Sequence, residues 1–515
     1  MTGVMAAPFI VRHAGVGMPE EAGPADGERS LDPEDWKAFR HLAHRLLDVC
    51  IDRLEGARDE PVWRAVPPAT KQALKTGLPR GGTPLPRVCE DFLSLIFPYP
   101  TGNIHPRFFG WVHGTGTATA MLAELCAAAM NSNCGGRDHA AIYVERQVIA
   151  WCREIFGFPE TASGLLTAGT SSATVIALTA ARRAHSGPPG AARPHLVAYA
   201  SAEAHAALGK ALELIGLGSD SLRPVPVTPD FRMDLDGLRM AIAADRAGGC
   251  TPFCVIATAG TVNTGAFDDI AAIAEICAEQ RLWLHVDGAF GAWARLADPA
   301  WRCLTRGIER ADSLAFDFHK WMYVQYDCGA VLIRDEKIHR AAFSRRPDYL
   351  GPQGAALAGG DPWYCEYGID LSRGFRALKV WFTLREFGLA RLGAKISDNC
   401  RQARHMAALV ERHPHLALLA PAVSNICCFR YVAAELGEPE LDALNAAIVA
   451  RLQESGIVAF STTRLRGRLA IRAAIANHRT RREDIAASIA AVAATGGELL
   501  RERRKPASGA TRRRQ

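Results

Sequence analysis

Short apolar runs alternate with longer alanine- and leucine-rich stretches between about residues 101 and 380. Five of the runs have the length and composition of β-strands: His195–Tyr199, Phe253–Thr258, Leu282–Asp287, Ser313–Phe318 and Gly329–Ile333. Strands that are apolar along their whole length are covered on both faces, which is typical of a parallel sheet between helices. The stretches Ala168–Ala184 and Asp269–Gln280 are predicted as helices that connect such strands. The pattern therefore predicts a large α/β domain over residues 101–380.

The chain before this domain has a different pattern. Residues 1–30 are rich in Gly, Pro and Glu, and they predict a flexible N-terminal segment. A helix start follows at Ser30–Glu34, and apolar residues then recur at helical spacing. We therefore expect a helical segment over residues 31–100, which the proline-rich stretch Pro61–Pro86 interrupts.

The chain after about residue 380 changes pattern again. Helical runs alternate with short strands such as Asn425–Val432 and Leu469–Ile475, which predicts a smaller α+β domain over residues 381–500. Within the large domain, Gly351–Asp361 is rich in Gly and Ala and is predicted as a mobile loop.

The charge of the chain is concentrated at its end. The 515 residues include 60 Lys and Arg and 54 Asp and Glu, a net charge of +6. Residues 501–515 hold seven cations and one anion, so they carry the whole excess and the rest of the chain is formally neutral. A block of like charges is typical of a disordered tail. The alternative is a non-catalytic protein that binds nucleic acid or anionic surfaces through this tail, which the candidate catalytic residues of the body disfavour.

Cysteine usage and hydropathy bear on the compartment. The fourteen cysteines are scattered without a repeated framework, which fits reduced thiols. Cys250 and Cys254 have no second pair nearby, so no metal site is predicted. Residues 1–30 lack a signal-peptide pattern, and the uncharged stretch Thr161–Ala181 contains eight Ser or Thr, which makes it too polar for a membrane span. We expect a soluble, cytoplasmic protein that does not bind membranes.

Residues able to do chemistry stand where predicted strands end. Lys320 follows the strand Ser313–Phe318, at a cleft rim where desolvation makes an amine nucleophilic enough to form a Schiff base with an aldehyde cofactor. Asp287 ends another strand, and a buried carboxylate needs a cationic partner, which the ring nitrogen of pyridoxal phosphate would supply. Taken alone, a surface lysine and a helix-capping aspartate are open alternatives. A metal site on His285 and Asp287 lacks a third ligand.

Two further segments extend this pattern. Ala168–Thr174 places small hydroxyl side chains and backbone N–H groups at a helix start, which suits a phosphate group. His205 follows the strand His195–Tyr199, where an imidazole would stack on a flat ring. A plain helix cap and a half-exposed loop histidine are the alternatives when each segment is taken alone. The four elements together are far more specific than any one of them.

With these elements in chain order, the sequence resembles the pyridoxal-phosphate-dependent group II amino-acid decarboxylases, which include aromatic-L-amino-acid, histidine and glutamate decarboxylases. The matching stretches are His105–Phe109, Leu284–Asp287, Asp312–Trp321, Phe375–Trp381 and Ile471–Thr480. The resemblance covers roughly residues 31–490, and His319-Lys320-Trp321 with the aspartate upstream is its most specific part. It implies the aspartate-aminotransferase-like fold (fold type I), with the cofactor bound by the large domain.

The resemblance also implies a role for each matching residue. Lys320 would hold the cofactor as a Schiff base, Asp287 would pair with its ring nitrogen, and the other contacts would come from His205 and Ala289 on the ring faces, Thr258 near the phenolic oxygen, and Thr170, Ser171 and His319 at the phosphate. Family members are homodimers whose active site lies at the interface, where a mobile loop crosses from the partner. In that loop, Tyr349 would return a proton to the substrate carbon.

The expected substrate wall departs from any one subfamily. It is placed at Trp111, Val112, His113, Asn131 and Asn133. The two asparagines make this wall similar to that of glutamate-type decarboxylases. Trp111, His113 and Tyr364, in contrast, leave room for an aromatic or heteroaromatic substrate side chain. We expect decarboxylation of an aromatic L-amino acid, with a polar or acidic amino acid as the alternative. A decarboxylation-coupled aldehyde synthase, which Tyr349 disfavours, and an aminotransferase of the same architecture are further alternatives.

Overall fold

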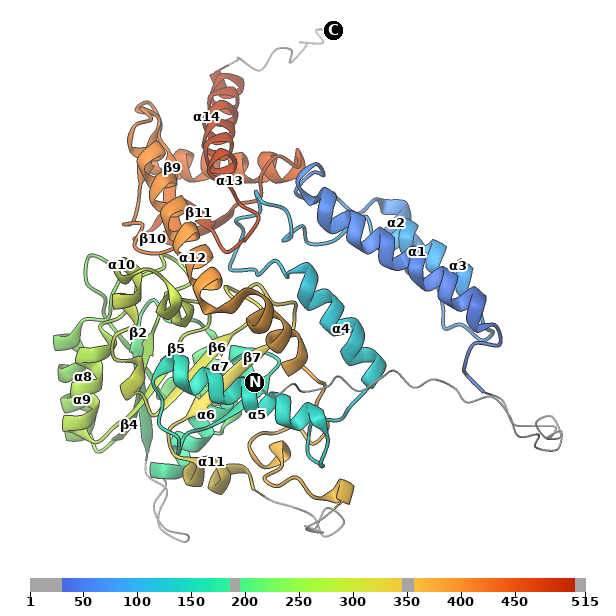
Figure 1. Ribbon diagram of the computed structural model, residues 1–515. Helices are drawn as coiled ribbons and strands as arrows, with labels where there is room; N and C mark the ends of the chain where they lie inside the picture. The colour runs from blue at the N-terminus through green and yellow to red at the C-terminus, as the bar shows by residue number, and fades with distance from the viewer. Residues whose placement is uncertain (1–29, 186–194, 345–355, 505–515) are drawn as a thin grey trace, which may run out of the picture. The chain divides into compact units, whose positions relative to one another are not determined.

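The computed structural model describes residues 30–185, 195–344 and 356–504 (Figure 1). The chain divides into two compact units, Met1–Cys50 and Ile51–Gln515. Helix α1 (Trp36–Glu55) contains the run of apolar residues at helical spacing, and its last residues belong to the second unit. The predicted proton donor Tyr349 lies outside the described residues, as does the first part of the predicted mobile loop.

Two short helices occur in the stretch where prolines were expected to interrupt helices. Helix α2 (Pro68–Ala73) lies inside Pro61–Pro86, and α3 (Leu85–Asp91) begins at its end. Each has a proline at the first or second helical position. Backbone N–H groups at these positions have no acceptor within the helix, so a proline there costs no hydrogen bond. The prolines of this stretch therefore also begin helices.

The centre of the second unit is a seven-stranded sheet in the order β1-β7-β6-β5-β4-β2-β3. Its strands are β1 (Ser163–Thr167), β2 (Leu196–Ser201), β3 (Leu222–Val225), β4 (Thr251–Thr258), β5 (Trp283–Asp287), β6 (Ser313–Asp317) and β7 (Gly329–Ile333). The five predicted strands correspond to β2, β4, β5, β6 and β7. Every residue of β2, β5, β6 and β7 is buried, as expected for strands covered on both faces.

One strand runs against the predicted direction. Neighbours among β2 to β6 pair in parallel, whereas β7 is antiparallel to both β1 and β6. Residues 318–328 connect β6 to β7 without an α-helix, and a parallel crossover needs a dozen or more residues, usually with a helix. The sheet is therefore mixed but mainly parallel, and this short connection carries Lys320.

The sequence pattern missed β1 and β3. Strand β1 is only five residues long and contains a glycine, two polar residues and only two leucines. Strand β3 contains Pro224 and is only partly buried, which is possible because it lies at the edge of the sheet.

Helices cover the sheet (Figure 1). The helices between residues 118 and 343 are α4 (Ala118–Met130), α5 (Ala140–Phe156), α6 (Thr170–His185), α7 (Ala207–Leu214), α8 (Leu235–Ala247), α9 (Ile270–Gln280), α10 (Pro299–Arg302) and α11 (Glu336–Phe343). Helix α6 packs on β5, β6 and β7, whereas α8 and α9 pack on β4. Helices α6 and α9 correspond to the two predicted connecting helices.

A smaller antiparallel sheet follows, in the order β10-β11-β9-β8. Its strands are β8 (Leu416–Leu418), β9 (Ile426–Tyr431), β10 (Ser461–Leu465) and β11 (Arg468–Ala474), and its helices are α12 (Ala377–Glu411), α13 (Glu438–Glu454) and α14 (Arg482–Arg504). Helix α12 is interrupted at Gly388, whose φ of 64° is not helical. Strands β9 and β11 are the two predicted strands.

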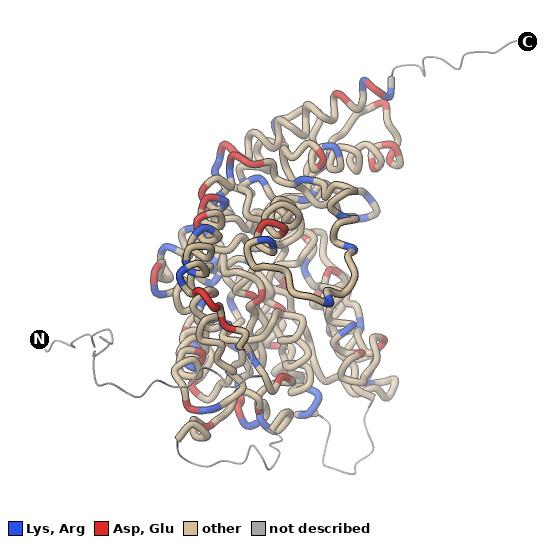
Figure 2. The backbone as a smooth tube through the Cα atoms, turned by 90° about the vertical axis from the view of Figure 1, so that its right-hand side faces the viewer, with Lys and Arg blue, Asp and Glu red and all other residues tan. Residues whose placement is uncertain are grey.

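The end of the chain corrects one expectation. The predicted disordered tail begins at residue 501, but α14 continues through Arg504. Figure 2 shows that basic and acidic residues are interspersed along the backbone before the tail, in line with the neutral body. In the part of the chain that the structure describes, no helix is both long enough and apolar enough to span a bilayer.

Candidate active site

The carboxyl ends of the parallel strands β4, β5 and β6 meet at one edge of the large sheet. Thr258 at the end of β4 is in register with Asp287 at the end of β5, and Asp317 ends β6. Open α/β sheets bind ligands at this edge, because the loops there leave a crevice. A cavity of about 530 Å³ lies at this edge and is the candidate active site.

This cavity brings together all the cofactor-binding residues that the sequence predicts. It is lined by Thr170, Ser171, His205, Thr258, Asp287, Ala289, His319 and Lys320. They lie at the ends of five strands, β1, β2, β4, β5 and β6, or in the segments that follow them. The fold therefore gathers residues that are up to 150 positions apart in the sequence.

Lys320 is held by the strand that precedes it. Its Nζ lies 2.9 Å from Oδ2 of Asp317, which is almost fully buried. The other carboxylate oxygen of Asp317 accepts the backbone N–H of Thr170 at 2.7 Å. One carboxylate therefore fixes both the lysine and the start of α6.

Asp287 has the environment of a counter-ion for a buried cation. Burial raises the pKa of its carboxyl, while the positive charge of Lys320 partly opposes that rise. The backbone N–H of Ala289 donates to Oδ1 at 3.2 Å and is the single hydrogen bond that the described residues give this carboxylate. A protonated ring nitrogen would stabilise the charged form of this side chain.

The start of α6 has the features of an anion cradle. Thr170 begins the helix, and a Cβ added at Gly169 would lie 3.3 Å from Cε1 of His319, so the backbone there approaches the His319 turn closely. The hydroxyl groups of Thr170 and Thr258 are buried, and neither has a hydrogen-bond partner among the described residues. Two unpartnered hydroxyls facing one cavity, beside a helix N-terminus, fit a phosphorylated polar ligand.

His319 is oriented by its neighbours. The backbone N–H of Cys328 donates to Nδ1 at 3.1 Å, and Nε2 lies 3.6 Å from Oδ2 of Asp317. Burial lowers the pKa of His319 more than Asp317 raises it, so the ring is neutral near pH 7. Because Nδ1 accepts, this network assigns the proton to Nε2. His205, by contrast, is exposed, and its Nδ1 accepts the N–H of Ala207 at 3.2 Å.

Three of the residues expected in the substrate wall line the same cavity. Trp111, Val112 and His113 follow one another there. Trp111 has a φ of 51°, and its N–H donates to Oγ of Ser461 on β10 at 3.2 Å. The His113 ring stacks on Phe108 with centroids 5.8 Å apart. Burial, together with the charge of Lys320, lowers the pKa of His113.

The other expected wall residues are not in this cavity. Asn131 ends α4 in the left-handed conformation and lines a separate cavity of about 310 Å³. Oδ1 of Asn133 accepts the N–H groups of Gly135 and Arg373. Tyr364 is buried beneath the guanidinium of Arg373. Helix α4 carries the two asparagines away from Trp111, which spacing along the chain does not reveal.

Sequence reasoning assigned no role to several residues of this cavity, Asp317 and Tyr326 among them. Asp317 stands three positions before Lys320 at a strand end, a signal that could have indicated the lysine's partner. Tyr326 lines the cavity from the same β6–β7 connection, and its ring lies 4.4 Å from that of His319. Its position follows from the antiparallel return of β7, so the sequence offered no comparable signal.

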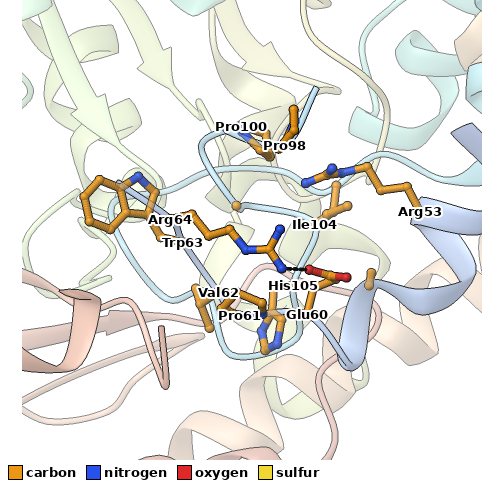
Figure 3. A pocket seen from close by; sticks show the side chains of 12 residues that line it. Arg53, Glu60, Pro61, Val62, Trp63, Arg64, Pro98, Pro100, Ile104 and His105 are labelled. Carbon is orange, nitrogen blue, oxygen red and sulfur yellow. Dashed lines mark hydrogen bonds and ion pairs between the residues drawn. The ribbon is translucent and has the colours of Figure 1, made fainter. Parts of the chain in front are cut away.

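A small pocket near the end of α1 shares no lining residue with this site. Figure 3 shows this pocket beside Val62 and His105, crossed by the ion pair of Glu60 and Arg64. Its volume of about 20 Å³ has room for about one water molecule. Across residues 30–185, 195–344 and 356–504, no cluster of three or more His, Cys, Asp or Glu side chains is placed to hold a metal ion.

The fold and the site together define a class of enzyme. A lysine after β6, a buried aspartate ending β5 and an anion cradle at the start of α6 are the parts that pyridoxal phosphate requires. A sequence model described as the pyridoxal-dependent decarboxylase conserved domain matches residues 67–432. The chain belongs to this family and is a pyridoxal-phosphate-dependent amino-acid decarboxylase, a carboxy-lyase.

Several known proteins are similar over most of the chain. An aromatic-L-amino-acid decarboxylase of Bacillus atrophaeus is 31% identical over 452 residues, which cover 87% of this chain and 93% of that protein. A histidine decarboxylase of Drosophila melanogaster is 32% identical over 474 residues, 88% of this chain and 54% of that one. The crystal structure of Oryza sativa TDC with pyridoxal phosphate and tryptamine has a TM-score of 0.84 and 26% identity, covering 92% of this chain and 100% of the other.

Proposed function

We propose that this enzyme converts an aromatic L-amino acid to the corresponding amine and carbon dioxide. The observation that carries the proposal is the aromatic wall of the cavity that contains Lys320. The ring centroids of Trp111 and His113 are 5.7 Å apart, and those of His113 and Tyr326 are 6.0 Å apart. Such rings favour edge and offset contacts with another flat side chain. The aromatic substrates of the Bacillus relative and the tryptamine in the rice structure support the same class.

The cofactor and the chain would divide the chemistry between them. Pyridoxal phosphate, when bound, withdraws electrons from the substrate α-carbon so that carbon dioxide can leave. Lys320 would hold its aldehyde carbon and Asp287 would keep its ring nitrogen protonated. The remaining contacts would be His205 and Ala289 on the ring faces, Thr258 near the phenolic oxygen, and Thr170, Ser171 and His319 at the phosphate.

Proton handling would be shared by three residues. Asp317 accepts from the ammonium group of Lys320 and keeps it directed into the cavity. Tyr349 would return a proton to the substrate carbon after carbon dioxide has left. This proton return gives an amine as the product, whereas an aldehyde synthase releases an aldehyde.

The enzyme is proposed to be a homodimer with a shared active site. Helix α4 has Leu122, Leu125 and Met130 exposed by 43%, 57% and 51%. The exposure of these apolar side chains on one helix supports a surface that another chain would cover. Light scattering during size exclusion should give twice the 55.6 kDa of one chain, and a substitution Leu125→Asp should shift the mass toward the single-chain value.

The experiment that tests the proposed reaction is a substrate panel. The holoenzyme is incubated with each of the twenty L-amino acids and with hydroxylated tryptophan and tyrosine, and amine, aldehyde and peroxide are measured. Amine from tryptophan, tyrosine or their hydroxylated forms supports the proposal. Amine from glutamate or another polar amino acid alone would favour the polar alternative, and aldehyde with peroxide would favour an aldehyde synthase.

A second measurement tests the role of Lys320 without depending on the substrate. Borohydride reduction of the holoenzyme should attach the cofactor to the peptide that contains Lys320. The variant Lys320→Ala should lose the adduct, whereas Lys210→Ala, at an exposed position on α7, should keep it. An adduct on any other peptide would overturn the assignment.

A further inference from the structure

A basic cavity separate from the catalytic one lies where the end of α1, helix α12 and the turn before α14 meet. Its volume is about 410 Å³. The charged residues that line it are Glu55, Arg58, Lys395, Arg479 and Arg481. Four of these are cations and one is a carboxylate, so the lining carries a net formal charge of plus three.

Only part of this positive charge is balanced by the protein. Arg58 pairs with Asp484 at 2.7 Å, and Lys395 lies 3.7 Å from Asp398. No carboxylate of the described residues lies within ion-pair distance of Arg479 or Arg481. The guanidinium of Arg479 instead donates to the carbonyl oxygen of Gly116 at 3.4 Å.

The cations also crowd a neutral histidine. His478 lines the same cavity, and burial, with the charges of Arg479 and Lys395, lowers its pKa to about 3. Burial likewise lowers the pKa of Arg479 and of Lys395. Burial therefore makes the charged forms of Arg479 and Lys395 more costly, and a bound anion would relieve that cost.

We propose that this cavity binds a phosphate group, either free or in a phosphate ester. Guanidinium groups pair with phosphate oxygens in two-point contacts, and the ammonium group of Lys395 adds a third charged donor. The volume leaves room for more than inorganic phosphate alone. A transition metal or other cation would be repelled by the same lining.

The proposed site is connected to the substrate wall. Oγ1 of Thr115 lies 2.6 Å from Nδ1 of His478, and Gly116 accepts from Arg479. These two residues follow His113, and a Cβ added at Gly114 would lie 1.9 Å from the carbonyl oxygen of His319. An anion that holds His478 and Arg479 therefore stiffens the segment that presents His113 to the catalytic cavity.

The test uses the holoenzyme, because the cofactor's own phosphate then fills the cradle at Thr170. Thermal unfolding is followed against inorganic phosphate, and against glycerol phosphate as an ester, with sodium chloride at matched ionic strength. We expect saturable stabilisation by phosphate and not by chloride. The variants Lys395→Met and Arg481→Ala should each weaken the apparent affinity about tenfold, since each removes one charge-assisted hydrogen bond. Arg391→Ala, on α12 but outside the lining, is the matched control.

Hydrogen exchange of the unaltered protein gives an independent readout. Phosphate should slow exchange in peptides that cover residues 114–117 and 478–484, and tighter binding of the ester than of phosphate would identify an esterified ligand. Equal effects of phosphate and chloride, equal affinity in Arg481→Ala and the parent, or unchanged exchange in both peptides would each overturn the proposal.

Discussion

The ammonium group of Lys320 lies 2.9 Å from the carboxylate of Asp317, three residues earlier in the chain. Because the same carboxylate accepts the N–H of Thr170, the lysine and the proposed phosphate cradle are fixed relative to each other. The two groups that would bind opposite parts of the cofactor are thus joined through one buried side chain. The contact is internal to the chain and depends on β6 lying next to β7, beside the start of α6.

Substitution of Asp317 should therefore weaken the binding of the cofactor, although Asp317 is not one of the proposed cofactor contacts. Asp317→Asn keeps the shape and an acceptor for Thr170 but removes the charge that faces Lys320. We expect the affinity of the apoenzyme for pyridoxal phosphate, measured by absorbance titration, to fall roughly tenfold to a hundredfold. Glu279→Gln, which breaks an exposed ion pair with Arg239, should leave that affinity unchanged. The same affinity in both variants would refute the role given to Asp317.

The buried histidine on β5 should make stability depend on pH. Burial lowers the pKa of His285 to about 3, whereas in the unfolded chain it is about 6.5. Above pH 6.5 both states are neutral at this residue and its contribution is fully present. As the pH falls below 6.5, only the unfolded state gains the proton, so the stabilising contribution is lost at about 1.4 kcal/mol per pH unit down to the folded pKa.

The variant His285→Asn isolates this effect, because all other titrating groups are shared. Between pH 6.5 and 5, the free energy of unfolding of the parent should fall by about 2 kcal/mol more than that of the variant. Urea unfolding at several pH values measures both. Asp268 acts in the opposite direction, since burial raises its pKa to about 6, but it contributes equally to the two proteins. Parallel pH profiles would contradict a neutral His285.

His113 should influence which aromatic substrate is preferred. Its lowered pKa keeps the ring neutral near pH 7, so one nitrogen can donate and the other can accept. We expect His113→Phe to lower kcat/KM for hydroxylated substrates about tenfold relative to phenylalanine, since one hydrogen bond to the substrate is lost. His113→Asn should restore part of the difference. If both variants keep the parental ratio, His113 does not contact the substrate side chain.

Tyr349 should control what happens after carbon dioxide has left. With the phenolic proton donor removed in Tyr349→Phe, we expect product to shift from amine to aldehyde, because dissolved dioxygen takes two electrons from the unprotonated substrate carbon and water then releases ammonia. Aldehyde, ammonia and hydrogen peroxide should form in equal amounts, with one dioxygen consumed per turnover. Peroxide is measured by a coupled peroxidase and the aldehyde by mass spectrometry. Tyr143→Phe, which removes an exposed hydroxyl bonded to Asp138, is the matched control. Parental rates of amine formation without peroxide would show that another group returns the proton.

Local pattern was sufficient to predict much of this molecule. Strands that are buried on both faces are apolar along their whole length, so β4, β5 and β6 could be recognised without any knowledge of their partners. A charged or hydroxyl-bearing residue at or directly after the end of such a strand is also a local signal, because it indicates a candidate site residue. Lys320, Asp287 and Thr170 were singled out from the sequence in this way, each weakly when taken alone, and the structure places all three in one cavity.

The tertiary structure decided what depends on residues distant in sequence. The antiparallel direction of β7, the contact of Asp317 with Thr170 and the departure of Asn131 from the substrate wall each arise from how elements pack and register. The basic lining around Arg479 is likewise assembled from segments more than 400 positions apart, such as Arg58 and Arg481. Sequence spacing contains no record of such pairings, because they depend on side chains that meet only after the chain has folded.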